Sequence, residues 1–192
     1  EQLLEIIGAA GDVGALILID EAYYPFYPHS AAALVEHNKH LIVAQTFSKA
    51  WGLTGLRLGY GIANLEIAGL LHKVRPNYEV NMVAIAVAER MLDYGNEMAA
   101  SVKRLNQGRD HFIASMNEIG FRTFPCQGSF LHVAFGPNAS AVHDALKNIA
   151  LYRQDFNVPC LKGFSRFSST TVELFQPLID RIIEVVKTAR EQ

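Results

Sequence analysis

The stretch LIVAQTFSKAWGLTGLRLGYGI, residues 41–62, decides the fold of this 192-residue chain. Residues 41–44 form a continuous apolar run, which is typical of a strand buried on both faces of a parallel sheet. A polar turn follows, and residues 57–62 predict a further short strand. Open α/β sheets bind their ligands beyond the carboxyl ends of their strands, so this turn is a candidate ligand site.

The sequence on either side extends this pattern. Upstream, ALILID (residues 15–20) predicts another strand buried on both faces, and residues 30–35 predict a short helix. Downstream, helices are predicted over 65–74, 81–119 and 172–190, with extended pieces between 121 and 135 and over 164–169. We therefore expect an α/β fold with a partial large domain built on a mostly parallel sheet (residues 1–96) and a small α+β domain (residues 97–192).

Composition argues against several classes of function. The net charge is −2 and no basic run occurs, so the chain is not expected to bind nucleic acid. No apolar stretch is long enough to cross a bilayer, and residues 1–14 do not resemble a signal peptide. Cys126 and Cys160 are far apart, and no HExxH or GxSxG motif is present. We expect a cytoplasmic protein without a membrane segment or a metal site.

Three residues at the predicted strand ends carry candidate chemistry. Lys49 is expected in a partly enclosed place, where desolvation favours the neutral amine that condenses with an aldehyde. Asp20 can hold a cationic ring nitrogen. Arg57, with the hydroxyls of Thr46 and Ser48, would make a phosphate clamp. Each also has an ordinary interpretation: a surface lysine, an aspartate capping a turn, and an arginine paired with a surface carboxylate.

These segments carry a family resemblance. TFSKAWGLTGLRLGY (residues 46–60) resembles the pyridoxal-phosphate attachment segment of the class I/II aminotransferases, which share fold type I. ILIDEAYYPF (residues 17–26) is similar to the family strand that ends in the aspartate bound to the pyridine nitrogen. The resemblance spans essentially the whole chain, and within the family it is strongest to histidinol-phosphate aminotransferases.

The resemblance implies roles in binding pyridoxal 5'-phosphate. Lys49 would bond covalently to the cofactor and move the proton of the substrate Cα, while Asp20 would pair with the ring nitrogen. The remaining cofactor contacts would be Tyr23 to the phenolic oxygen and Thr46, Ser48 and Arg57 to the phosphate. Arg166, in FSRFSSTT, matches the position that grips the substrate carboxylate, although its motif departs from the usual LRxxxG pattern. Its ordinary interpretation is an arginine on an edge strand.

The implied reaction moves an amino group between an L-amino acid, such as histidinol phosphate or a similar compound, and a 2-oxo acid. The family also implies a homodimer. The chain is expected to begin after the family's N-terminal half, which supplies an aromatic residue stacked on the cofactor and further phosphate donors. Two alternatives stay open: a pyridoxal-phosphate decarboxylase or lyase of the same fold, and an inactive truncated fragment that only binds other chains.

Overall fold

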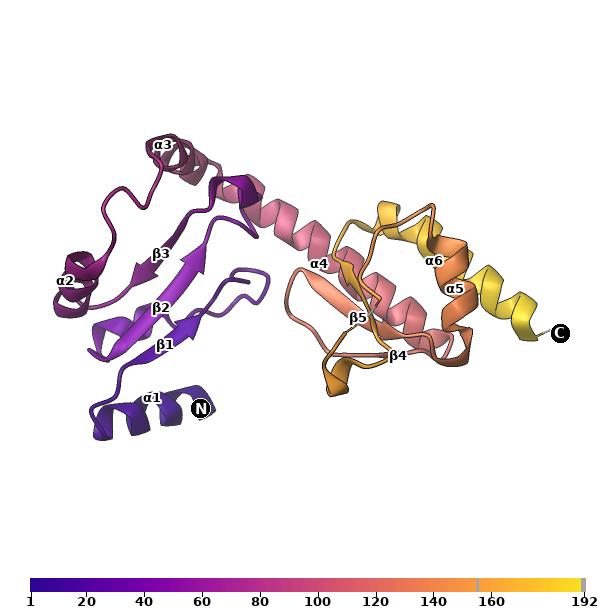
Figure 1. The fold of residues 1–192 in the computed structure, drawn as a ribbon, viewed down its shortest axis with the longest axis horizontal. Coiled ribbons are helices and arrows are strands. Elements are labelled where there is room, and N and C mark those ends of the chain that lie inside the picture. The colour runs from indigo at the N-terminus through magenta and orange to yellow at the C-terminus, as the bar shows by residue number, and fades with distance from the viewer. Residues whose placement is uncertain (155, 191–192) are drawn as a thin grey trace. The chain divides into compact units, whose positions relative to one another are not determined.

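The computed structural model describes residues 1–154 and 156–190. Contacts within the chain divide it into a first unit, residues 1–99, and a second unit from residue 100 onward. Helices and strands alternate in the first unit and mix in the second, so the α/β class predicted from sequence is confirmed (Figure 1). The first unit contains α1 (Gln2–Asp12), β1 (Ile17–Asp20), β2 (Leu41–Thr46), β3 (Gly59–Ile62), α2 (Leu65–Val74) and α3 (Met82–Met91).

The first unit is built on a three-stranded sheet in the order β1-β2-β3. β1 runs parallel to β2, with Asp20 opposite Ala44. β3 runs antiparallel to β2, with Gly59 opposite Thr46. The chain therefore leaves β1 and β2 at the same edge of the sheet, and β3 begins there (Figure 1). That edge collects the polar segments that the sequence singles out.

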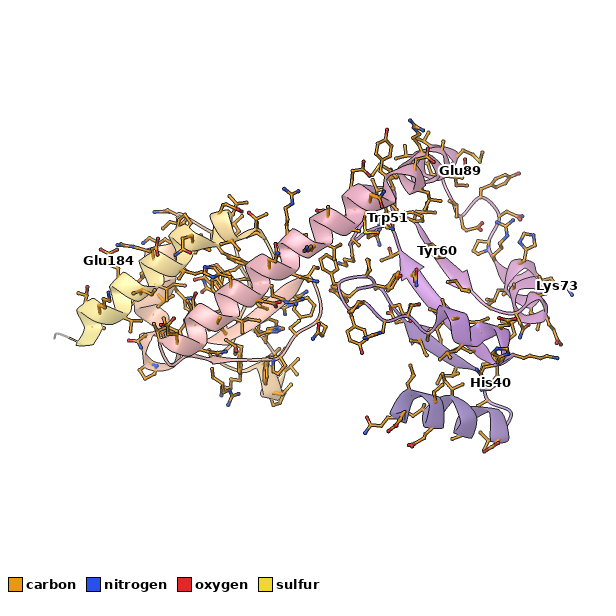
Figure 2. All side chains as sticks on the ribbon, turned by 180° about the vertical axis from the view of Figure 1, so that it is seen from behind. His40, Trp51, Tyr60, Lys73, Glu89 and Glu184 are labelled. Carbon is orange, nitrogen blue, oxygen red and sulfur yellow. The ribbon has the colours of Figure 1, made fainter. Side chains whose placement is uncertain are left out.

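Only one face of this sheet carries an extensive apolar core. Ile7 of α1 and residues around a 3-10 turn (Ala32–Glu36) cover Leu41 and Val43, which are fully buried. His40, labelled in Figure 2, contributes to this packing, because its Nε2 lies 2.7 Å from the carbonyl oxygen of Ile7. The predicted burial of the start of β2 is confirmed, since Ile42 on the opposite face is buried as well.

The prediction that β1 is buried on both faces is wrong. Leu18 is 60% exposed and Asp20 is exposed, whereas Ile17 and Ile19 on the other face are half-buried. β1 is an edge strand that pairs only with β2, and no described element covers the Leu18 side. Apolar runs indicate which residues favour burial, but burial also requires a covering layer.

Asparagine side chains begin both of the next helices. Asn64 accepts hydrogen bonds from the backbone N–H groups of Glu66 and Ile67 at 2.9 and 3.0 Å, and Asn81 accepts one from Val83 at 2.8 Å. These caps satisfy N–H groups that the first helical turn leaves unpaired. The predicted helix over 65–74 is confirmed. The helix predicted over 30–35 is instead a 3-10 turn at Ala32–Glu36.

In the second unit, three α-helices pack with a small antiparallel sheet. Its strands run in the order β4 (Arg122–Thr123), β5 (Phe130–Ala134) and β6 (Ser165–Ser168). The helices are α4 (Gly95–Glu118), α5 (Ala139–Leu146) and α6 (Val172–Arg190), with 3-10 turns at Leu92–Tyr94 before α4, and at Gly136–Asn138 and Pro159–Leu161. The final helix predicted over 172–190 is confirmed.

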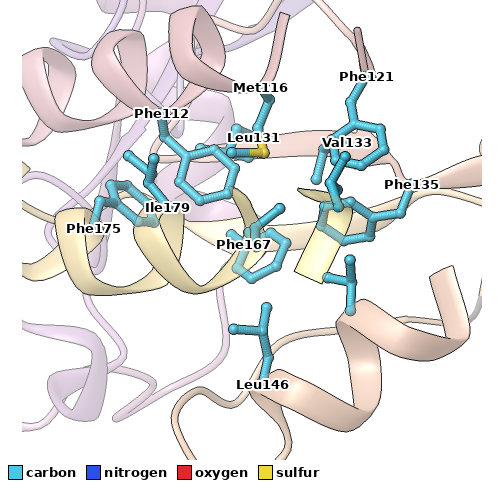
Figure 3. Packing of buried hydrophobic residues seen from close by; sticks show 13 residues of the cluster. Phe112, Met116, Phe121, Leu131, Val133, Phe135, Leu146, Phe167, Phe175 and Ile179 are labelled. Atoms are coloured by element: carbon cyan, nitrogen blue, oxygen red, sulfur yellow. The ribbon is translucent and has the colours of Figure 1, made fainter. Parts of the chain in front are cut away.

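One face of this sheet forms an aromatic-rich core. Phe112 of α4, Phe175 of α6 and Phe167 of β6 meet there, with the Phe112 and Phe175 ring centroids 4.7 Å apart (Figure 3). α4 approaches the chain before α6 so closely that a Cβ at Gly108 would lie 1.9 Å from the carbonyl oxygen of Thr170. Among the described residues, no helix is long and apolar enough to cross a membrane.

Candidate active site

Asp20 lies exposed at the carboxyl end of β1. Its Oδ1 accepts a hydrogen bond of 2.9 Å from the backbone N–H of Ala22, which shapes the turn that follows the strand. Its Oδ2 has no hydrogen-bond partner among the described residues. Asp20 therefore caps a turn with one oxygen and keeps the other available for a ligand.

Glu21 holds the site together rather than facing a ligand. Its carboxylate accepts hydrogen bonds from Ser30 Oγ at 2.6 Å, the backbone N–H of Ala31 at 2.6 Å and Gln45 Nε2 at 2.8 Å. Gln45 in turn accepts a hydrogen bond of 2.6 Å from the Tyr60 hydroxyl. These bonds tie the segment after β1 to both β2 and β3. No local pattern indicates this role, because the partners lie 9 to 24 residues away.

Lys49 follows β2 in a tight turn, and its side chain is exposed. The expected partial enclosure of Lys49 is therefore wrong for the described residues. The Nζ of Lys49 lies 5.5 Å from the centroid of the Tyr23 ring. This contact joins the segments that follow β1 and β2, and it brings together two of the residues predicted as cofactor contacts.

The two hydroxyls predicted for a phosphate clamp differ in their availability. Thr46 Oγ1 donates to the carbonyl oxygen of Leu58 at 3.1 Å and accepts from the backbone N–H of Ser48 at 3.1 Å. A hydroxyl has one proton to donate, so that of Thr46 is already used within the protein. Ser48 Oγ accepts a hydrogen bond of 3.4 Å from Arg57 Nη1 and keeps its own proton. Ser48 and Arg57 therefore form the available part of the clamp.

Arg57 adopts a left-handed backbone conformation with φ 52° and ψ 43°. A non-glycine residue there costs about 1–2 kcal/mol, and such strain is concentrated at functional sites. A left-handed residue cannot be part of a regular strand, so β3 begins at Gly59 and not at residue 57 as expected. Gly59 is needed at that point, because a Cβ would lie 2.8 Å from the Gln45 carbonyl oxygen.

Arg57 carries an uncompensated charge. Its guanidinium contacts Ser48 Oγ and, at 3.2 Å, the Thr54 carbonyl oxygen, but it forms no ion pair with a carboxylate of the described chain. The ordinary interpretation of a surface ion pair is thus not what the structure shows. A guanidinium with spare donors beside a serine hydroxyl is suited to bind a phosphate.

Arg166 lies in the second unit, in the middle of β6. Its guanidinium carbon is 4.0 Å from the centroid of the Phe130 ring, and it has no carboxylate partner among the described residues. Arg153 pairs with Arg166 through reciprocal backbone hydrogen bonds of 3.1 and 2.7 Å. Residues directly opposite in an antiparallel pair share one face, so both arginines project from the same side. Arg153 was not predicted, because its isolated bridge carries no strand pattern in sequence.

The chain matches a known family over residues 1–182, that of class I and II aminotransferases. The chain belongs to the class I and II aminotransferase family. It is 34% identical over 176 residues to "Histidinol-phosphate aminotransferase 2" of Methylococcus capsulatus, an alignment that covers 88% of this chain and 47% of that protein. The chain spans about half the length of the curated relatives it matches.

Solved structures show the fold of this chain. The histidinol-phosphate aminotransferase from Clostridium acetobutylicum superposes with a TM-score of 0.83 at 23% identity, covering 96% of this chain and 58% of that one. The enzyme from Sinorhizobium meliloti, solved in complex with pyridoxal-5'-phosphate, gives 0.76 at 24% identity and covers 96% and 53%. Decarboxylases share the same fold. The predicted fold type I architecture is therefore confirmed.

The residues at the sheet edge fit the cofactor of this family, which is pyridoxal phosphate. The aldehyde requires an amine, the pyridinium nitrogen a carboxylate oxygen, and the phosphate cationic and neutral donors. Lys49, Asp20, Ser48 and Arg57 offer these groups with hydrogen-bonding capacity to spare. Among the described residues, no cluster of three or more His, Cys, Asp or Glu side chains could hold a metal ion.

Proposed function

We propose that this chain carries cofactor- and substrate-binding machinery of a pyridoxal-phosphate-dependent aminotransferase, which moves an amino group between an L-amino acid and a 2-oxo acid. The observation that carries the proposal is a group of three side chains at one sheet edge: the exposed amine of Lys49 beside Tyr23, the Asp20 Oδ2, and the Arg57 guanidinium. Within the part of the chain that the structure describes, Asp20 Oδ2 has no hydrogen-bond partner and Arg57 has no counter-ion. We further propose a homodimer in the cytoplasm, as expected for the family.

Each residue has a distinct task in this proposal. Lys49 bonds to the cofactor aldehyde and then holds or moves the proton at the substrate Cα. Asp20 uses Oδ2 to keep the ring nitrogen protonated, so that the bound cofactor acts as an electron sink. Ser48 and Arg57 hold the phosphate. Tyr23 lies against Lys49 and binds the phenolic oxygen.

The remaining predicted contact, Thr46, works indirectly. Its hydroxyl bonds to the Leu58 carbonyl and the Ser48 N–H, so it fixes the position of Ser48 between β2 and the segment before β3. We assign Thr46 a positioning role in phosphate binding, in place of direct donation of its hydroxyl proton.

A negatively charged group on the amino donor would suit the second unit. Arg166 binds the substrate carboxylate in this proposal, and Arg153 projects from the same face of the sheet. In a phosphorylated amino alcohol, which has no carboxylate, the phosphate would take the place of the carboxylate at Arg166. This supports a substrate similar to that in the names of the histidinol-phosphate aminotransferases.

The test begins with cofactor attachment. Adding pyridoxal phosphate to the 192-residue chain should give a visible absorption band, and borohydride reduction should leave a permanent mass addition on the peptide that contains Lys49. Lys49→Ala should lose both signals. Lys73→Ala is the matched control, because Lys73 is an exposed lysine of α2 in the same unit (Figure 2). A mass addition shared evenly between Lys49 and Lys73 would contradict the proposal.

The reaction type requires a second assay on the loaded protein. An aminotransferase forms a 2-oxo acid from the donor and leaves the amino group on the cofactor, whereas a decarboxylase releases carbon dioxide. Decarboxylases with this fold make the comparison necessary. Release of carbon dioxide without any 2-oxo acid would replace the aminotransferase proposal by a decarboxylase. A folded chain that binds no cofactor would favour the inactive fragment.

A further inference from the structure

His132 stands in an unusual environment on the outer face of β5. Leu131 and Val133 on either side are fully buried in the core, so the His132 ring projects from the opposite face of the sheet. Three phenylalanine rings meet it edge to face, with centroid distances of 6.3 Å to Phe124, 5.4 Å to Phe130 and 5.6 Å to Phe156.

Neither ring nitrogen of His132 has a hydrogen-bond partner among the described residues. The two nitrogens are not fully closed off from solvent, because the buried side-chain N or O atom without a partner among the described residues is Ser169 Oγ. Other described histidines do form hydrogen bonds within the chain; His40, for example, bonds to the carbonyl oxygen of Ile7. The polar atoms of His132 are therefore available to a ligand.

Among the described residues, the charged side chains placed beside His132 by strand pairing and ring contacts are arginines. Arg166 lies directly opposite it on β6, and Arg153 is the next residue in the same cross-strand row. Arg122 of β4 stacks on Phe164 at 4.8 Å, and Phe164 stacks on Phe124 beside the His132 ring. Asp155 lies outside the described residues. Burial, and then the charge of Arg166, lower the pKa of His132.

We propose that His132 is a further binding residue of the Arg166 subsite, which donates a hydrogen bond to the anion held by Arg166 and takes up a proton as that anion binds. The inference rests on the proposed role of Arg166 as the substrate-carboxylate arginine. It adds a residue that no family motif in the sequence indicates, because its position emerges only from the strand register.

The coupling follows from the charges on this face. In the free protein, neighbouring arginines disfavour an imidazolium at His132. An anion bound between His132 and Arg166 reverses the local field, so the protonated ring becomes favourable. A rise of one pKa unit corresponds to about tenfold tighter binding of the anion to the protonated form. Anion affinity should therefore increase as the pH falls through the His132 titration.

Proton NMR of the imidazole Cε1–H groups of the 192-residue chain tests this coupling. The probe is 2-oxoglutarate, whose carboxylates stay ionised above about pH 5, compared with sodium chloride at equal ionic strength. The His132 signal is assigned with His132→Gln. Without the probe it should titrate below the ordinary histidine value of about 6.5, and saturating probe should raise the midpoint by about one pH unit. Arg166→Ala should abolish the change.

Two variants separate the hydrogen bond from the proton. His132→Gln keeps a donor but cannot take up a proton, so its probe affinity should be nearly independent of pH between 5 and 8. His132→Phe preserves packing against the three phenylalanines but offers no donor, so its affinity should fall several-fold and also lose the pH dependence. Circular dichroism verifies that both variants are folded.

The outcomes distinguish the two proposals. If the probe moves the Arg166 Nε resonance but not the His132 midpoint, the role of His132 is refuted and that of Arg166 stands. If neither signal moves, Arg166 is not an anion subsite and the inference about His132 fails with it. Attachment of the cofactor to Lys49 is measured independently in both cases.

Discussion

Replacing Glu21 by alanine should destabilise the first unit strongly. The carboxylate accepts three hydrogen bonds from Ser30, Ala31 and Gln45. Hydrogen bonds to charged groups contribute about 1.5–3 kcal/mol each. Glu21 is half-buried and the freed Ser30 and Gln45 side chains can rehydrate, so we expect a loss of about 3 kcal/mol of unfolding free energy.

Glu21→Gln should lower the unfolding free energy by less than Glu21→Ala, and it tests the hydrogen bond from Gln45. The amide keeps one acceptor oxygen, but its NH2 group would face the NH2 of Gln45, which now donates to Glu21. Gln45 cannot rotate its oxygen into place without losing the hydrogen bond of 2.6 Å from Tyr60. We expect roughly half of the effect of the alanine variant, since the amide oxygen still accepts a hydrogen bond, although a neutral one.

Urea unfolding measured by tryptophan fluorescence reports on this unit directly. Trp51 is the single tryptophan of the chain, and its ring packs against Phe47 with centroids 5.8 Å apart. With a urea dependence of about 2 kcal/mol/M, Glu21→Ala should lower the midpoint by about 1.5 M. Glu89→Ala, at an exposed site on α3 of the same unit, is the control and should stay within about 0.5 kcal/mol of the parent (Figure 2). Equal midpoints for the two variants would refute the structural role of Glu21.

Four further predictions concern other parts of the chain. Gly108→Ala should destabilise the second unit by about 2–3 kcal/mol in thermal unfolding, because its Cβ would overlap the Thr170 carbonyl. Arg57→Ala should weaken pyridoxal-phosphate binding about tenfold or more in a spectroscopic titration, and Arg57→Lys should restore only part of it. Burial raises the pKa of Tyr60, so its phenol should ionise above the ordinary value of about 10 in an ultraviolet titration, and its contribution to stability should be lost as the pH rises through the folded-state pKa. The lowered pKa of His132 has the opposite sign: its contribution is present above about pH 6.5 and is lost as the pH falls through the folded-state pKa, so His132→Phe should flatten the acid limb of urea midpoints against pH.

Much of the fold could be predicted because the local signals agree with the tertiary structure. α2 carries apolar residues at helical spacing with an asparagine cap before it, and its predicted bounds of 65–74 are those observed. α6 was equally predictable. β1 was not, because the apolar run ALILID does not reveal whether a second layer covers it. Leu18 is exposed for that reason, although its neighbours favour a buried strand.

The sequence predicts which residues belong to the candidate site, but not which of them face a ligand and which hold the site in place. Asp20 ends β1, Lys49 follows β2 and Arg57 precedes β3, and the strand pairing brings these segments to one edge of the sheet. Glu21 is adjacent to Asp20 and also carries a carboxylate, yet its partners come from residues 30 to 45. Hydrogen-bond partners that are distant in sequence leave no local pattern. The role of Glu21 in holding the site together therefore cannot be predicted from the sequence.

Spare hydrogen-bonding capacity separates the residues that face a ligand from those that support them. Glu21 and Thr46 form their hydrogen bonds with partners inside the protein. Glu21 links the segment after β1 to β2, and Thr46 links β2 to the segment before β3. Asp20 Oδ2, the Ser48 hydroxyl proton and the Arg57 guanidinium remain available at the same edge. Arg57 has a strained backbone conformation and, among the described residues, no carboxylate partner. Both features are unfavourable for the folded state, and a bound anion would compensate for them. The same criterion identifies His132 in the second unit: among the described residues its ring nitrogens have no hydrogen-bond partner, and Arg166 opposite it has no carboxylate partner.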